Sequence, residues 1–321
     1  MQLKEIIKSI REEEPEVKSI FLVGCGGSLA DLYPAKYLLE SETERFNIGY
    51  YSSNEFVHAT PKLLNEKSIV IVCSHEGETP ETVQAAAISK KIGAKTISVT
   101  NKPNSSLAEN GNYVVLYDWG EESNGKSSKM GVVLEIAFEI LKQFEDYANY
   151  ENAQDAFDKI GLITEKAVQF AGKRADEFAE KYKDEKIFYV MSSGASYGNA
   201  YSYSICLLME MQWINASGIH SGEYFHGPFE ITDREVPFIV LINEGRTRAL
   251  DERALKFLKS YGEKLIILDA KELGLNTIDD SVIEFFNPIL FTCVLREYAE
   301  KLAIARKHPL SQRRYMWKLE Y

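Results

Sequence analysis

The chain has 321 residues, 45% of them hydrophobic, which is enough apolar material for the cores of two domains of ordinary size. Its formal net charge of -11, from 48 acidic and 37 basic residues, argues against general binding to nucleic acid or to an anionic membrane. The longest apolar runs fall far short of the roughly 20 residues that a membrane span needs, and the first residues lack the uncharged core of a secretory signal, so a cytoplasmic protein is expected.

Short apolar strands alternate with amphipathic helices in the first half of the chain, which is the pattern of a parallel, doubly wound sheet. The strands are expected at 19–23, 47–51, 68–73, 95–99 and 112–116. The helices are expected near 29–40, 80–91 and 130–149, and Gly93 is expected to end the second of them. A long linking helix is expected over 151–184, because its apolar positions recur three to four residues apart.

A second alternation of strands and helices follows the linking helix. Its strands are expected at 186–191, 216–220, 237–242 and 264–269, and its helices at about 196–213, 246–260 and 284–306. The two halves open alike, since FLVGCGGS at 21–28 is echoed by FYVMSSGAS at 188–196. We therefore expect an α/β fold with two doubly wound, flavodoxin-like parallel-sheet domains in tandem, one over residues 1–150 and one over 151–321.

The turn at 24–28, directly after the first expected strand, has the composition of an anion-binding loop. Gly26 and Gly27 allow backbone N–H groups to approach an anion, and the Ser28 hydroxyl is expected both to cap the helix and to donate. A dinucleotide-binding motif begins in the same way, but Leu29 stands where its third glycine is required. The turn alone is equally compatible with an ordinary connection between a strand and a helix.

A second loop of this kind follows the strand at 68–73. Thr79 is expected as the N-cap and Pro80 as the first helical residue, so the free amides of the first turn point back toward Ser74 and His75. By itself this loop is as compatible with an ordinary cap as with an anion site. Two such loops on neighbouring strands favour a bound phosphate.

Glu210 lies in the apolar stretch 206–214, where none of its helical neighbours is basic. If this helix is buried, the loss of hydration raises the pKa of the carboxyl toward a range that suits a catalytic base. The alternative is an ordinary glutamate that reaches a distant arginine or solvent. His226 precedes Gly227 and Pro228, so its imidazole is expected to project from a turn, and a packed structural histidine is the alternative.

The two loops, GCGGS and SHEGETPET, and the duplicated α/β plan resemble those of the sugar isomerase (SIS) domain proteins over nearly the whole chain. Residues 209–214, 220–233 and 313–321 are similar to the fructosamine deglycase group of that family. The resemblance implies that Glu210 is the base that transfers protons and that His226 opens the sugar ring. It also implies a phosphorylated sugar-amine substrate, with 6-phosphofructose-aspartate the closest match, which is split into glucose 6-phosphate and the amino acid.

The resemblance further implies a homodimer whose active sites are shared, because the histidine comes from the neighbouring subunit in family members. No metal and no organic cofactor are expected, and the four scattered cysteines do not form the pattern of a metal site. Glu223 is placed to orient His226 or the substrate amine. Ser128, Lys129 and Lys318 are candidates for substrate contact, although both lysines could equally be ordinary surface residues. Four arginines are candidate partners for the carboxylates of an acidic amino acid: Arg246, Arg248, Arg313 and Arg314.

The chain departs from the isomerases of the family in two places. Glu76 stands where they typically carry a serine, and we expect its side chain to point away from a phosphate. Leu207 and Met209 stand where lysines precede the isomerase glutamate, which favours a deglycase. Two alternatives stay open: a sugar-phosphate isomerase that uses the same acid–base pair, and a sugar-phosphate sensor without catalysis. The sensor would need a DNA-binding module, for which the residues before the first expected strand leave no room.

Overall fold

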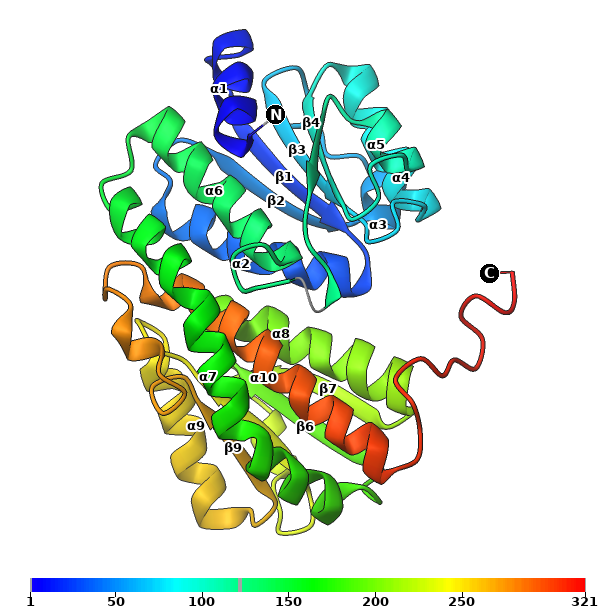
Figure 1. Cartoon of the computed structure of the whole chain (residues 1–321), viewed down its shortest axis with the longest axis vertical. Helices are drawn as coiled ribbons and strands as arrows, with labels where there is room; N and C mark the ends of the chain where they lie inside the picture. The colour runs from blue at the N-terminus through cyan, green and yellow to red at the C-terminus, as the bar shows by residue number, and fades with distance from the viewer. Residues whose placement is uncertain (1, 121–122, 321) are drawn as a thin grey trace. The chain divides into compact units, whose positions relative to one another are not determined.

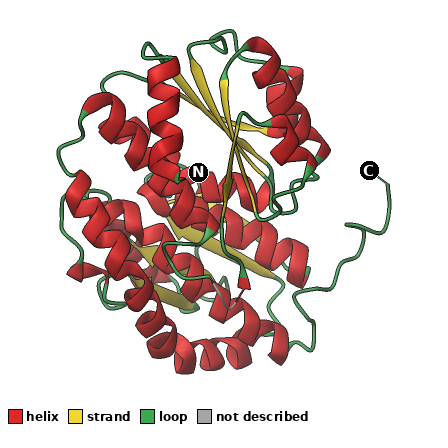
Figure 2. Ribbon diagram, turned by 45° about the horizontal axis from the view of Figure 1, so that its top comes forward, coloured by secondary structure: helices red, strands yellow, loops and turns green. Residues whose placement is uncertain are grey.

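The computed structural model describes residues 2–120 and 123–320 of a chain that forms two compact units, Met1–Asp158 and Lys159–Tyr321 (Figure 1). In each unit the strands lie side by side between helices, as Figure 2 shows in yellow and red. The long helix α7, Tyr150–Tyr182, runs from the first unit into the second. Within the described residues, no helix combines the length and the apolar character that crossing a membrane would require.

The first unit contains a five-stranded parallel sheet with the strand order β2-β1-β3-β4-β5. Its strands are β1 Ser19–Gly24, β2 Asn47–Ser52, β3 Ser68–Cys73, β4 Lys95–Thr100 and β5 Tyr113–Leu116. Its helices are α1 Leu3–Glu13, α2 Gly26–Glu42, α3 Ser53–His58, α4 Pro80–Ile92, α5 Ser106–Asn110 and α6 Lys129–Glu145. Helices α1, α2 and α6 lie on one side of this sheet in Figure 1, and α3, α4 and α5 lie on the other.

Strands β1 and β3 are buried along their whole length, as expected for central strands of a sheet that helices cover on both faces. Phe21 and Val23 point to one face and pack with Phe56 of α3 and Leu107 of α5. Successive side chains of a strand point to opposite faces, so both sides of these strands must be apolar. This requirement explains the uninterrupted apolar runs in the sequence.

The second unit contains a four-stranded parallel sheet with the strand order β7-β6-β8-β9. Its strands are β6 Ile187–Ser192, β7 Asn215–His220, β8 Phe238–Ile242 and β9 Leu265–Asp269. Its helices are α8 Tyr197–Ser202, which continues into the π-helix η3 Tyr203–Met211, then α9 Arg248–Tyr261 and α10 Ile283–Ala305. Three short 3-10 turns complete it: η2 Gly194–Ser196, η4 Pro228–Ile231 and η5 Leu275–Thr277.

The two sheets share one plan, since β6 lies between β7 and β8 as β1 lies between β2 and β3. The expected α/β fold class with two parallel sheets in tandem is confirmed. All nine expected strands are present, but the helices α1, α3 and α5 and the π-helix were not among the expected elements. In the first sheet, β3 pairs with β1 residue by residue, so Cys73 lies opposite Gly24 and the turns after these two strands are neighbours.

We predict that Gly77→Ala destabilises the first unit by about 1–3 kcal/mol. Gly77 has φ of +70°, and an added Cβ would lie 2.1 Å from Ser105 Oγ and 2.4 Å from Ser105 Cβ. The control is Gly172→Ala in α7, where an added Cβ meets no atom within 4 Å and should stabilise the helix by about 0.5–1 kcal/mol. Urea unfolding of both variants measures the difference, and a Gly77 variant as stable as the parent would contradict the prediction.

Candidate active site

The first turn of α2 presents backbone amides at the carboxyl end of β1. Cys25 is the N-cap, and the helix begins at once with Gly26, whose φ of +53° is one that glycine adopts without strain. In the described part of the chain, the N–H groups of Gly26 and Gly27 meet no acceptor. They are therefore available to an anion at the positive end of the helix dipole.

Ser28 does not cap this helix, so that expectation was wrong. It lies inside the first turn, and its own N–H donates to the carbonyl of Cys25 at 3.1 Å. Its hydroxyl instead accepts a hydrogen bond from Lys129 Nζ at 3.2 Å. The side chain therefore belongs to a polar cluster beside the turn.

The loop after β3 has the cap that the sequence predicts. Thr79 is the N-cap of α4, Pro80 is its first residue, and the helix ends at Gly93 in the left-handed conformation. The hydroxyls of Ser74 and Thr79 are 2.9 Å apart and share one hydrogen bond, and Ser74 is buried. Since each hydroxyl carries one hydrogen, one of the two hydrogens is left to donate to a ligand.

His75 is held by the aromatic side chains around it. Its Nδ1 is 2.7 Å from the Tyr117 hydroxyl, and its ring centroid is 4.6 Å from that of Trp119. Burial, and then the nearby Lys129 charge, lower the pKa of this histidine below its usual value. The imidazole is therefore neutral at physiological pH. The side chain of Glu76 beside it is 64% exposed and approaches His75 Nε2 at 3.4 Å.

Lys129 is a buried residue of this unit rather than a surface lysine. Its Nζ lies 2.8 Å from Asp31 Oδ2, and both side chains are largely hidden from solvent. Burial by itself lowers the pKa of Lys129, but Asp31 and other nearby groups raise it above the usual value, so the amine stays charged. Asp31 lies one turn after Ser28 on α2, and this spacing places both side chains on one face of the helix. The spacing is the sequence signal from which a polar cluster of Ser28 and Asp31 could have been predicted.

Ser128 performs a structural task at the start of α6. Its hydroxyl accepts a hydrogen bond from the N–H of Gly131 at 3.1 Å and donates one to the carbonyl of Gly125 at 2.9 Å. It is therefore the N-cap that places Lys129 at the first position of the helix.

The equivalent turn of the second unit is filled by the protein's own side chains. A Cβ added to Gly194 would lie 2.5 Å from Thr247 Oγ1. Asp251 is buried behind this turn and accepts hydrogen bonds from the Ser221 hydroxyl at 2.6 Å and from Asn243. Burial raises the pKa of Asp251, while these hydrogen bonds act in the opposite direction. Thr247 thus lies close against the repeated turn, although the sequence of this turn resembles that of the first.

Glu210 lies near the end of the π-helix η3, and its side chain is 23% exposed. The expectation that its helical neighbours offer no partner is confirmed, but Arg313 from the C-terminal segment pairs with it, with Nη2 2.7 Å from Oε1. Burial raises the pKa of Glu210, and the Arg313 charge opposes that shift. π-Helical turns are rare and are often found at functional sites.

The C-terminal segment is fixed to the end of this π-helix by several contacts. Gln212 Nε2 donates to the carbonyl of His308 at 2.8 Å, and the ring of His308 lies 4.5 Å from that of Trp213. Arg314 lies 4.3 Å above the Trp213 ring. Lys318 donates to the backbone carbonyl of Arg313. Lys318 therefore supports the position of Arg313 within the same chain.

His226 and Glu223 lie on the turn that follows β7, and both are exposed. The N–H of His226 donates to the carbonyl of Glu223 at 2.9 Å, and Gly227 follows with φ of +131°. Within the described residues of one chain, no hydrogen bond or ion pair joins His226 to Glu210. The imidazole thus projects from a turn, as the sequence predicts, without packing into a core.

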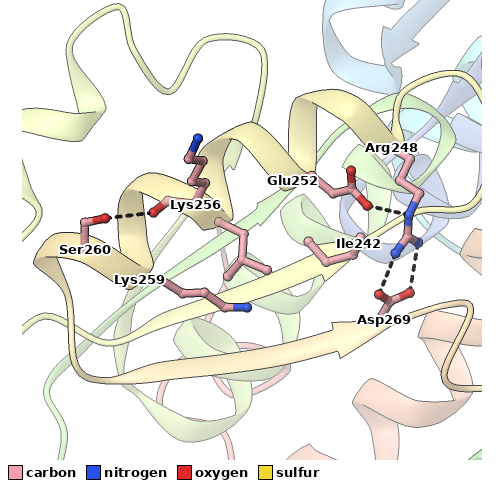
Figure 3. A pocket seen from close by; sticks show the side chains of 8 residues that line it. Ile242, Arg248, Glu252, Lys256, Lys259, Ser260 and Asp269 are labelled. Atoms are coloured by element: carbon pink, nitrogen blue, oxygen red, sulfur yellow. Dashed lines mark hydrogen bonds and ion pairs between the residues drawn. The ribbon is translucent and has the colours of Figure 1, made fainter.

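A cavity of about 550 Å³ on the second unit does not contain the predicted acid–base pair (Figure 3). Arg248 lies in its wall and forms two hydrogen bonds with Asp269, of 2.9 and 2.7 Å, and one with Glu252 at 2.8 Å. Because carboxylates already neutralise this guanidinium, it is poorly suited to bind an anion. Arg246 is likewise paired, with Glu284. The described residues contain no cluster of His, Cys, Asp and Glu that could hold a metal ion.

Comparison with known proteins places these features in a family. The SIS domain family model matches residues 16–141, which span both turns of the first sheet. The chain is 50% identical to the fructosamine deglycase FrlB of Bacillus subtilis, over 95% of this chain and 93% of that protein. It is 25% identical to the fructoselysine 6-phosphate deglycase of Escherichia coli, over 97% of this chain and 89% of that protein.

A solved structure shows the same fold over the full chain. That solved structure is of a candidate phosphosugar isomerase of Bacillus subtilis, and it matches this chain with a TM-score of 0.95 and 47% sequence identity. The match covers 99% of this chain and 97% of the other. The chain therefore belongs to the SIS domain family, within its group of fructosamine deglycases.

Proposed function

We propose that this protein is a fructosamine-6-phosphate deglycase. It converts a 6-phosphofructosyl amino acid and water into glucose 6-phosphate and the free amino acid. The observation that carries the proposal is the half-buried Glu210 on a π-helix, in a chain that is 50% identical to a fructosamine deglycase. A carboxylate with a raised pKa, held in a protected position, suits the removal of a proton from carbon.

The turns of the first unit are assigned to the phosphate of the substrate. The amides of Gly26 and Gly27 and the hydroxyl pair of Ser74 and Thr79 supply donors to an anion. The N-termini of α2 and α4 add the positive ends of two helix dipoles. Lys129 is neutralised by Asp31, so its main contribution is to position the Ser28 hydroxyl. The neutral His75 takes part as a hydrogen-bonding group.

The reaction requires an open-chain substrate, in which C1 lies between the amine nitrogen and the C2 carbonyl. His226 opens the ring by moving a proton between the ring oxygen and the anomeric hydroxyl, which imidazole does well near neutral pH. Glu210 then takes a proton from C1. The electron pair of that C–H bond forms the C1–C2 double bond, and the C2 oxygen gains a proton, which gives an enaminol.

Proton return to C2 converts the enaminol into an imine at C1. Water adds to C1, and the resulting carbinolamine expels the amine, which leaves with a proton as the free amino acid. The C1 aldehyde that forms is glucose 6-phosphate. The steps are proton transfers, the addition of water to C1 and the cleavage of the C1–N bond as the protonated amine leaves, for which acid–base catalysis by the carboxylate and the imidazole is sufficient.

His226 is assigned to the active site of the neighbouring subunit of a homodimer. Its exposed position on a turn, without contact to Glu210 in the same chain, supports this assignment. Glu223 lies on the same turn and is proposed to orient the histidine or the substrate amine. The proposed substrate is 6-phosphofructose-aspartate, and because a sugar phosphate is charged and cannot cross a lipid bilayer freely, the enzyme is assigned to the cytoplasm.

Incubation with a panel of 6-phosphofructosyl amino acids should release glucose 6-phosphate, detected through its coupled oxidation by a dehydrogenase. The aspartate adduct is expected to have the highest kcat/KM of the panel. If no adduct is cleaved and separately supplied fructose 6-phosphate is isomerised, the protein is an isomerase instead. The unphosphorylated aspartate adduct is the control and should react poorly.

Thr79→Val should raise KM for the phosphorylated adduct about 10- to 100-fold, because it removes one hydroxyl donor to a charged group. The change keeps the shape of the side chain but removes the partner of the buried Ser74 hydroxyl, so the variant should also lose about 1–3 kcal/mol of stability. Thr60→Val is the matched control, because Thr60 is exposed and its hydroxyl bonds the end of α3. An unchanged KM would remove the second loop from the phosphate site.

Glu210→Gln and His226→Asn should each lower kcat by at least about 100-fold, since each removes one proton-transfer group. When the two inactive variants are unfolded together and refolded, mixed dimers should regain about a quarter of the parent activity, because half of the dimers are mixed and each has one intact shared site. No recovery on mixing would contradict a shared site. Variants that keep normal turnover would contradict the assigned roles.

A further inference from the structure

Arg313 has a hydrogen-bonding edge that Glu210 only partly occupies. The side chain is 7% exposed, and Nη1 donates to the backbone carbonyls of Leu310 and Gln312 at 2.6 and 3.0 Å. Nη2 contacts Glu210 at 2.7 Å, whereas Nε is buried and has no acceptor among the described residues. Nε and Nη2 form the edge of a guanidinium that binds a carboxylate through two parallel hydrogen bonds. A buried donor without a partner is costly, which indicates that a second acceptor belongs there.

The other arginines that the sequence offers for a substrate carboxylate are less suitable. Arg246 is engaged by Glu284, and Arg248 is held by Asp269 and Glu252. Arg314 is exposed and lies over the ring of Trp213. Of these four residues, Arg313 is the one that touches the proposed base and retains an unused donor.

The chemistry of the proposed substrate brings a carboxylate close to the same point. In an adduct of an α-amino acid, only the nitrogen and Cα separate the carboxylate from C1, the carbon that loses a proton to Glu210. A guanidinium in contact with Glu210 is therefore within reach of that carboxylate when Glu210 is within reach of C1.

We propose that Arg313 binds the carboxylate of the amino acid part of the substrate, and that this binding releases Glu210 to act on C1. The inference rests on the proposed deglycase function. Two carboxylates compete for one guanidinium edge, and the substrate gains more because it can occupy both Nε and Nη2. Arg313 is thus a residue that determines specificity and couples recognition of the amino acid to the availability of the base.

The electrostatics of the pair agree with this exchange. Burial raises the pKa of Glu210 and the Arg313 charge lowers it. When a substrate carboxylate neutralises Arg313, this lowering weakens, so Glu210 becomes a stronger base at the moment when C1 is in place. Without substrate, the ion pair keeps the carboxylate occupied.

The test uses two substrates that differ in one group, 6-phosphofructosyl-glycine and 6-phosphofructosyl-glycinamide. For the parent enzyme, kcat/KM should be about 100-fold lower with the amide, which cannot replace Glu210 on the guanidinium. Arg313→Gln should lose about 100-fold on the carboxylate substrate but should cleave the amide at least as fast as the parent, because Glu210 is no longer held. Arg313→Lys keeps the positive charge but lacks the two parallel donors, so its kcat/KM on the carboxylate substrate should lie between those of the parent and of Arg313→Gln.

Arg296→Gln is the matched control and should behave as the parent with both substrates, since its side chain is exposed and pairs with Glu300 on the same helix. Equal losses with both substrates in Arg313→Gln, or a parent enzyme that does not distinguish them, would overturn the inference and leave the deglycase function standing. A parent enzyme that cleaves neither these two substrates nor the aspartate adduct would overturn the function and the inference together. Thermal unfolding of each variant separates a loss of fold from a loss of recognition, and the comparison of substrates on the parent enzyme needs no variant.

Discussion

The parallel pairing of β1 with β3 is the constraint on which the first unit depends. It places the ends of two strands side by side, with Gly24 opposite Cys73, so the turns that follow them open at the same edge of the sheet. Each turn leads into a helix whose first amides have no helical acceptor. Two helix N-termini therefore converge where an anion can bind, in a protein whose net charge is negative.

The duplicated second unit shows how the same plan is used differently. Its first turn keeps glycine and serine, yet Thr247 occupies the space beside Gly194, and Asp251 binds Ser221 and Asn243 behind it. These contacts place the protein's own side chains against the turn. The proposed base of this unit, Glu210, lies instead at another place, on a π-helix.

A π-helix is a less stable form of backbone than an α-helix, so its ends need support. Here the support comes from the C-terminal segment, through Gln212, the ring of Trp213 and the Glu210–Arg313 pair. The same segment thus stabilises the local backbone and sets the electrostatic environment of the proposed base. A substrate carboxylate at Arg313 would act on both, which links recognition of the amino acid to the chemistry at C1.

The alternation of strands and helices, the parallel sheets, the Thr79 cap and the end of α4 at Gly93 were predictable from the order of the residues alone. These features depend on residues that are close in the sequence: the spacing of apolar residues, a proline at the first helical position and a glycine after the last helical residue. Ser28 is not the N-cap that local composition predicts, because α2 begins earlier, at Gly26, with Cys25 as its N-cap. The burial of Lys129 against Asp31, the approach of Thr247 to the repeated turn and the pairing of Arg313 with Glu210 became visible in the three-dimensional fold. Each of these contacts joins residues that are distant in the sequence and come together in a low-dielectric environment. A local sequence pattern therefore does not predict them.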